Sequence, residues 1–122
     1  MEHQEIYTRL KNMIQKYAPP LSVKTETNDR YELYTKKNVE LNGKKYDEFF
    51  FGSIILKSQY IGFYFMPIYI YPELLIDVPE TLKKLQTGKS CFHIKKYEQS
   101  IFNAISDLIE TGFDAYRKNN LI

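Results

Sequence analysis

The chain has 122 residues, a net charge of +2 and an aromatic content of 16% without tryptophan. An apolar fraction of 43% and a charged fraction of 26% exclude a disordered or collagen-like chain. This length predicts a single domain, residues 1–122, that buries its own core without disulfide bonds or a structural metal. One cysteine excludes an intramolecular disulfide, and no apolar run is long enough to span a membrane. We therefore expect a cytoplasmic protein that makes no use of a membrane.

Two amphipathic helices are predicted, one near each end of the chain. Ile6, Leu10 and Ile14 recur at helical spacing before Pro19-Pro20, which ends the first helix. A wide apolar stripe in the last segment predicts a long C-terminal helix and consists of Ile101, Ala104, Ile105, Leu108, Ile109, Gly112, Phe113 and Tyr116.

Strand patterns fill the region between the helices. Residues 21–27 and 31–36 alternate polar and apolar side chains, which predicts a hairpin with one wet face. The pair Asn42-Gly43 predicts a second, short hairpin, because a type I′ turn needs two residues with positive φ. Residues 47–57 and 60–71 are rich in Phe, Ile and Tyr and are predicted to be the central strands.

A short helix and a last strand complete the pattern. The helix starts at Val78 with Pro79 in its first position, and Gly88 suits a left-handed residue after its end. A short strand is predicted over residues 89–95. The sequence as a whole predicts a two-layer α+β fold, in which an antiparallel sheet of about five to six strands carries the N- and C-terminal helices on one face.

Side-chain parity predicts how the central strands use their two faces. One face is strictly apolar, is expected under the helices and consists of Phe50, Gly52, Ile54, Leu56, Ile61, Phe63, Phe65 and Pro67. The other face mixes aromatic, polar and small residues: Phe51, Ser53, Ile55, Lys57, Tyr60, Gly62, Tyr64 and Met66. Two interpretations fit this second face. Loops or a homodimer partner cover it, or it is a platform for a flat or apolar ligand.

Cys91 and His93 share one face of the last predicted strand, and Phe92 takes the buried face. A thiol beside an imidazole and Lys89 suits a nucleophile or half of a metal site. No third ligand or orienting group accompanies them, and free cysteines are most often small buried hydrophobes. We therefore predict that the protein is not an enzyme.

Two charged clusters allow further interpretations. Asp107, Glu110 and Asp114 share one face of the last helix and suit either a weak site for a hard cation or iron, or a solvated surface. Residues 81–97 hold five lysines and no acid, which suits phosphate, nucleic acid or solvated turns. The nearly neutral net charge and the lack of an arginine-rich helix argue against nucleic acid.

Three stretches of the sequence stand out by their order and spacing: Tyr64-Phe65-Met66-Pro67-Ile68-Tyr69 with Pro72 and Leu74-Leu75, then Gly88-Lys89-Ser90-Cys91-Phe92, then Gly112-Phe113 through Tyr116. Together they resemble the YdhG-like family of small bacterial proteins. The resemblance implies a frataxin-like fold with helices on one face of an antiparallel sheet. It also implies intracellular iron delivery as a function to consider, which in frataxin-like proteins depends on acidic surface ridges.

The prediction is therefore a non-enzymatic YdhG-like binding or interaction protein that requires no cofactor. Its expected surface for a small ligand or a protein partner comprises Tyr60, Tyr64, Met66, Lys89, Cys91 and His93. The alternative is a frataxin-like intracellular iron chaperone that holds iron through Asp107, Glu110 and Asp114, and a second alternative is a thiol-dependent or nucleic-acid-related role.

Overall fold

The computed structural model describes all 122 residues. The strands of the main sheet are β1 (Ser22–Glu26), β2 (Arg30–Tyr34), β5 (Phe50–Leu56), β6 (Ile61–Phe65), β7 (Gln86–Thr87) and β8 (Cys91–Ile94). The α-helices are α1 (His3–Ile14), α2 (Met66–Ile70), α3 (Glu80–Lys83) and α4 (Gln99–Lys118), and the 3-10 helices are η1 (Gln15–Tyr17) and η2 (Pro72–Leu75).

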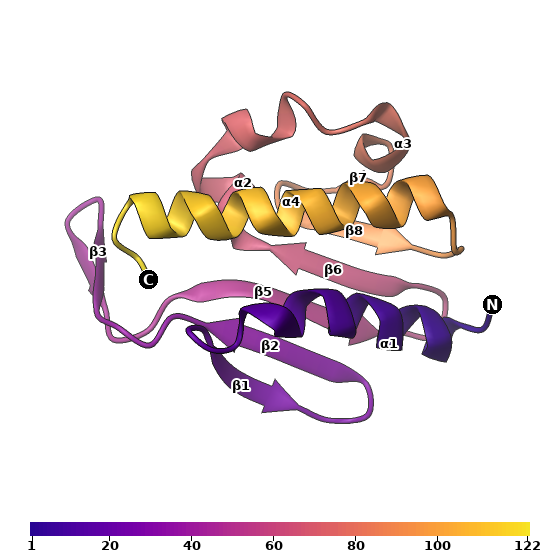
Figure 1. Cartoon of the computed structure of the whole chain (residues 1–122), viewed down its shortest axis with the longest axis horizontal. Helices are drawn as coiled ribbons and strands as arrows, with labels where there is room; N and C mark the ends of the chain where they lie inside the picture. The colour runs from indigo at the N-terminus through magenta and orange to yellow at the C-terminus, as the bar shows by residue number, and fades with distance from the viewer.

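The six strands form one antiparallel sheet in the order β1-β2-β5-β6-β8-β7. Both long helices, α1 and α4, lie on the same face of this sheet, as Figure 1 shows. The predicted two-layer α+β fold is confirmed. None of the helices combines the length and the hydropathy that crossing a membrane requires.

The core lies between the helices and the sheet, as the sequence patterns predict. From α1 it takes Ile6, Leu10 and Ile14, which are completely buried. All eight residues of the predicted C-terminal stripe are buried in α4. Amphipathic helices of this kind are stabilised mainly by burying one face against the sheet rather than by helix propensity.

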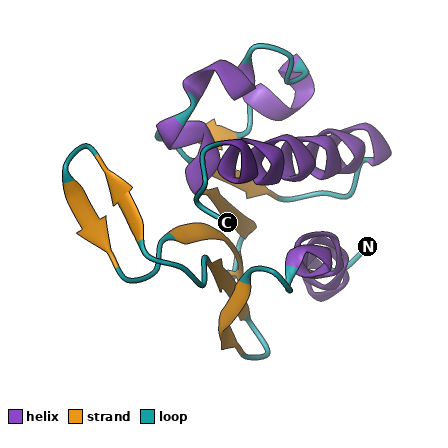
Figure 2. Ribbon diagram, turned by 60° about the vertical axis from the view of Figure 1, so that its left-hand side comes forward, coloured by secondary structure: helices purple, strands orange, loops and turns teal.

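A separate hairpin, β3 (Val39–Leu41) with β4 (Lys44–Tyr46), is inserted between β2 and β5 and stands away from the main sheet (Figure 2). Its turn has φ angles of 53° at Asn42 and 79° at Gly43, which confirms the predicted type I′ turn. Two hydrogen bonds fix its base: Thr35 N donates to the Phe49 carbonyl at 2.8 Å, and Phe49 N donates to Thr35 Oγ1 at 2.9 Å.

A β-bulge interrupts the pairing of β2 with β5. Leu33 pairs with Gly52, whereas Tyr34 pairs with Phe50, so Phe51 is an extra residue in β5. A bulge of this kind turns the side chains that precede it to the opposite face. From Gly52 onward the predicted parity is confirmed.

The bulge reverses the predicted faces of two phenylalanines. Phe51, expected on the outer face, is completely buried on the helix side, with its ring centroid 5.2 Å from that of Phe65 and 5.3 Å from that of Tyr116. Phe50, expected in the core, turns outward and packs against Tyr34 at 5.3 Å. Simple alternation is wrong at these two positions because it assumes that neither strand has an extra residue.

Both central strands are shorter than predicted. The strand predicted over residues 60–71 ends at Phe65, and α2 follows at once. Pro67 lies at the start of α2, where a helix needs no backbone N–H donor, and it is buried. Met66 is therefore the first residue of a helix and does not belong to the outer face of the sheet. The other strand begins at Phe50 instead of Asp47.

The segment around α3 also differs from its prediction in detail. Pro79 is the N-cap of α3 rather than its first helical residue. Gly88 has the expected positive φ of 70°, but it lies in the turn between β7 and β8 and does not follow a helix. In β8, Phe92 and Ile94 are completely buried, and Cys91 with His93 takes the opposite face as predicted.

Candidate functional site

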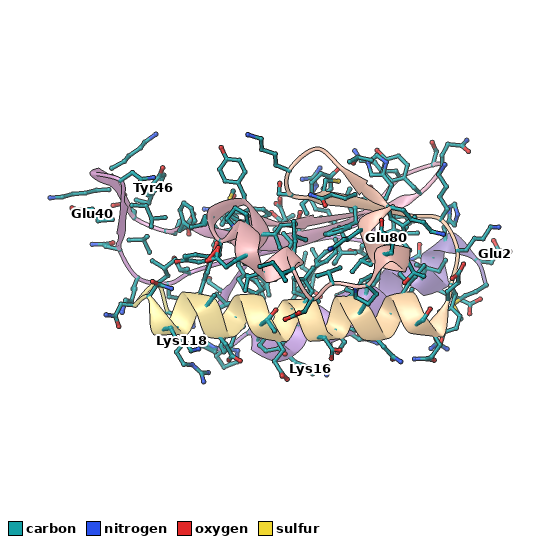
Figure 3. All side chains as sticks on the ribbon, turned by 90° about the horizontal axis from the view of Figure 1, so that it is seen from above. Glu2, Lys16, Glu40, Tyr46, Glu80 and Lys118 are labelled. Atoms are coloured by element: carbon teal, nitrogen blue, oxygen red, sulfur yellow. The ribbon has the colours of Figure 1, made fainter.

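No helix covers the outer face, by which we mean the face of the main sheet turned away from α1 and α4. Figure 3 shows α4 on one side of the sheet and side chains without a covering helix on the other. Cross-strand pairing places these side chains in two rows, one of Glu32, Ser53, Tyr64 and Cys91 and one of Arg30, Ile55, Gly62 and His93.

Aromatic side chains of the chain itself cover the β6–β8 part of the outer face. The rings of Tyr60 and His93 stack with centroids 3.8 Å apart and planes 21° from parallel. The ring of Tyr64 lies over Gly62, where an added Cβ would be only 2.6 Å from Tyr64 Cε2. Ser53, the cross-strand partner of Tyr64, is only 2% exposed although no helix lies over it. Side chains of the chain itself thus cover part of this face, and the predicted alternatives of a covering loop, a homodimer partner or a bound ligand stay predictions.

Tyr64 and Cys91 are cross-strand neighbours on the outer face. Burial raises the pKa of the Tyr64 phenol, and the adjacent Cys91 raises it further. The phenol therefore stays protonated at neutral pH. The Cys91 thiol is half-buried, and its Sγ lies 3.8 Å from the carbonyl oxygen of Phe92. This geometry suits a packed cysteine.

The largest hollow of the surface lies between the β3–β4 hairpin and the body of the protein, and we call it the aromatic groove. It has a volume of about 1030 Å³ and is open to solvent. Six aromatic residues line it: Tyr34, Tyr46, Phe49, Phe50, Tyr69 and Tyr71. Figure 3 labels Glu40 and Tyr46 on the hairpin that forms one wall. The volume is at the upper end of the range typical of ligand pockets.

Polar groups of both signs line the same groove. Glu40, Lys44 and Glu48 contribute charges, and Glu48 forms an ion pair with Lys24. Lysine ammonium groups lie 5.4 to 5.9 Å from the ring centroids of three groove tyrosines, as Lys24 over Tyr34, Lys44 over Tyr46 and Lys89 over Tyr69. The groove therefore combines stacking surfaces with ammonium groups at its rim.

The structure divides the predicted binding surface in two. Tyr60, Tyr64, Cys91 and His93 lie together on the outer face, whereas Met66 lines the aromatic groove. The sixth residue, Lys89, lies in the β7–β8 turn and reaches a groove tyrosine.

The sequence interpretation missed most of the groove. Asn42-Gly43 does place the hairpin that carries Tyr46, but no short-range pattern shows where that hairpin rests. Phe50 enters the groove only because the bulge turns it outward. Tyr69 enters it because α2 replaces a predicted strand and leaves this ring 55% exposed.

The acidic residues proposed for iron lie on the exposed side of α4. Asp107 borders one small hollow with Pro79, and Asp114 borders another with Lys118. Glu110 is exposed like the other two. Nowhere in the protein do three or more His, Cys, Asp or Glu side chains form a group that could hold a metal ion.

A scan against protein-family models found no matching family, and searches of curated proteins and of solved structures found no matching protein. The resemblance to the YdhG-like family thus stays a prediction.

Proposed function

We propose that this is a non-enzymatic binding protein that holds a flat organic ligand in the aromatic groove. The observation that carries the proposal is the convergence of six aromatic rings from β2, β4, the start of β5, α2 and the residues that flank them on one open hollow of about 1030 Å³. Rings stacked against a flat ligand contribute roughly 0.5–1.5 kcal/mol each beyond the area they bury.

The groove is held open before any ligand arrives. Thr35 and Phe49 join the two ends of the hairpin segment through their hydrogen bonds, and Val39 at the start of β3 is buried in the main core. On the other wall, Leu121 is 4% exposed and its N–H donates to the Tyr116 carbonyl at 2.9 Å. Because the walls of the groove are already ordered, ligand binding does not have to include the free-energy cost of ordering them.

The test is a titration of the ¹⁵N-labelled protein with 2-naphthol, followed by NMR, beside its saturated analogue decahydro-2-naphthol. The two probes share a carbon skeleton, and only 2-naphthol is flat. We expect 2-naphthol to shift the amide signals of the hairpin, α2 and the C-terminal residues, and the saturated probe to bind at least fivefold more weakly.

One variant and one matched control complete the experiment. Tyr69→Ala removes a groove ring that is 55% exposed, so the fold should tolerate it, and should weaken 2-naphthol binding about fivefold or more. Ile76→Ala removes a large apolar side chain that is 73% exposed and lies outside the groove, and should leave binding unchanged. Equal binding of both probes, or equal effects of both variants, would overturn the proposal.

A further inference from the structure

Another hollow lies near the start of α4, whereas the hairpin lies near the end of that helix (Figure 1). We call it the basic pocket. It has a volume of about 350 Å³, and its polar lining consists of Lys84, Thr87, His93, Lys95, Lys96 and Glu98. Three lysines and one glutamate thus line a space that is large enough for one small ligand.

The three lysines of the basic pocket have no anionic partner within the protein. Its ion pairs join Lys11 to Glu26, Lys24 to Glu48 and Arg30 to Glu32, and none of them involves a pocket lysine. Like charges that share one hollow repel one another, and a bound anion relieves that repulsion. The charge pattern therefore favours an anionic ligand.

An aromatic pair borders the same pocket. His93 lines it, and the ring of Tyr60 stacks on the imidazole at a centroid distance of 3.8 Å. Tyr60 directly precedes β6 and is partly exposed. The pocket accordingly offers cationic donors beside a stacked pair of flat rings.

We propose that the basic pocket binds a nucleotide, with its phosphate on Lys84, Lys95 and Lys96 and its base against the Tyr60–His93 pair. A phosphate group at neutral pH carries a charge between about −1.5 and −2 and three strong acceptor oxygens, which suits three ammonium groups better than a carboxylate would. The site is separate from the aromatic groove, and either proposal can fail without the other.

The test is an NMR titration of the ¹⁵N-labelled protein with AMP, ribose 5-phosphate and adenosine. AMP should shift the amide signals of residues 84–98 and leave those of the hairpin in place. Ribose 5-phosphate should bind the same residues about tenfold more weakly because it lacks the base. Adenosine should bind at least tenfold more weakly than AMP because it lacks the phosphate.

Lysine variants test where the phosphate lies. The double variant Lys95→Gln/Lys96→Gln should weaken AMP binding at least tenfold. Its control, Lys36→Gln/Lys37→Gln, alters another adjacent exposed pair in the loop between β2 and β3 and removes the same charge. The control should change AMP binding less than twofold, because these side chains lie outside the pocket.

Tyr60→Leu tests the position of the base. It should bring AMP binding down to that of ribose 5-phosphate and leave ribose 5-phosphate within twofold of its original affinity. A variant that fails to fold would instead lose the binding of both AMP and ribose 5-phosphate. Equal binding of AMP and ribose 5-phosphate to the unaltered protein, or equal effects of the two lysine double variants, would overturn the proposal.

A nucleotide can be free or part of a strand, so a further arm uses a 5′-phosphorylated oligoadenylate of six residues. Affinity within threefold of AMP would identify the free nucleotide as the ligand. Affinity a hundredfold above that of AMP, lost steeply between 50 and 200 mM salt, would identify single-stranded nucleic acid, because several phosphates then displace counterions. No shift at residues 84–98 with either molecule would refute the nucleotide site.

Discussion

The hydroxyl of Tyr116 donates a hydrogen bond of 2.7 Å to the carbonyl oxygen of Phe50. This contact joins the last turns of α4 to the bulged start of β5, residues that are 66 positions apart. Phe50 is also the residue that the bulge turns into the aromatic groove. The C-terminal helix thus helps to fix one wall of the groove.

Tyr116→Phe should lower the free energy of unfolding by about 1–2 kcal/mol. The substitution keeps the buried ring but leaves the Phe50 carbonyl without its donor. Urea unfolding followed by circular dichroism measures the change. Tyr69→Phe removes a hydroxyl from an exposed ring and serves as the control, with an expected change below about 0.5 kcal/mol. Equal losses in the two variants would contradict the assigned role of this hydrogen bond.

Stability should fall as the pH rises above 10. Burial raises the pKa of Tyr7 to about 12, helped by Asp29 and Glu26, and burial also raises the pKa of Tyr116. A tyrosine in the unfolded chain titrates near pH 10, so above that pH the unfolded state releases its protons first. The stability that these protonated tyrosines contribute to the folded state is fully present below pH 10. The part that comes from Tyr7 is lost between pH 10 and about 12.

Urea titrations at pH 8 and pH 11 measure this loss. Tyr116→Phe has no phenol to titrate at that position, so the variant should lose less stability between the two pH values than the unaltered protein. An identical loss of stability in the variant and the unaltered protein would show that titration of Tyr116 does not contribute to the pH dependence.

Gly112→Ala should destabilise the protein although alanine favours helices. A Cβ at this position would lie 2.3 Å from Phe65 Cζ, so α4 or the ring must shift. Overpacking of this kind costs about 1–3 kcal/mol, against a gain of about 1 kcal/mol in helix propensity. We expect the free energy of unfolding, measured by urea unfolding, to fall by about 1 kcal/mol.

Two further variants show whether Phe65 is the cause. In a Phe65→Leu background the smaller side chain leaves more room, so Gly112→Ala should cost less than in the unaltered protein. Thr111→Ala, at an exposed position of the same helix, should not destabilise it. A cost that is the same in both backgrounds would point to a contact other than Phe65.

Gly43→Ala should cost about 1 kcal/mol of stability. No atom lies within 4 Å of the added Cβ, so the whole effect comes from the φ of 79° in the hairpin turn. Gly43→Asn should cost clearly less, because asparagine tolerates left-handed conformations. Urea unfolding of the two variants measures the difference, and equal costs would mean that backbone strain is not the reason.

Local patterns in the sequence determine much of this fold. Helical spacing locates α1 and α4, and parity assigns Phe92 and Cys91 to opposite faces of β8. Asn42-Gly43 predicts its turn because only certain residues adopt two positive φ angles in succession. Each of these features depends on residues that are close in the chain, which is why the sequence alone determines them.

Only the tertiary structure decides where the candidate sites lie. The bulge at Phe51 depends on how β5 pairs with β2, and it exchanges the faces of Phe50 and Phe51. The aromatic groove and the basic pocket each bring together segments that are far apart in the sequence. Composition predicts that aromatic rings and lysines will reach the surface, but packing between distant segments decides which of them share one hollow.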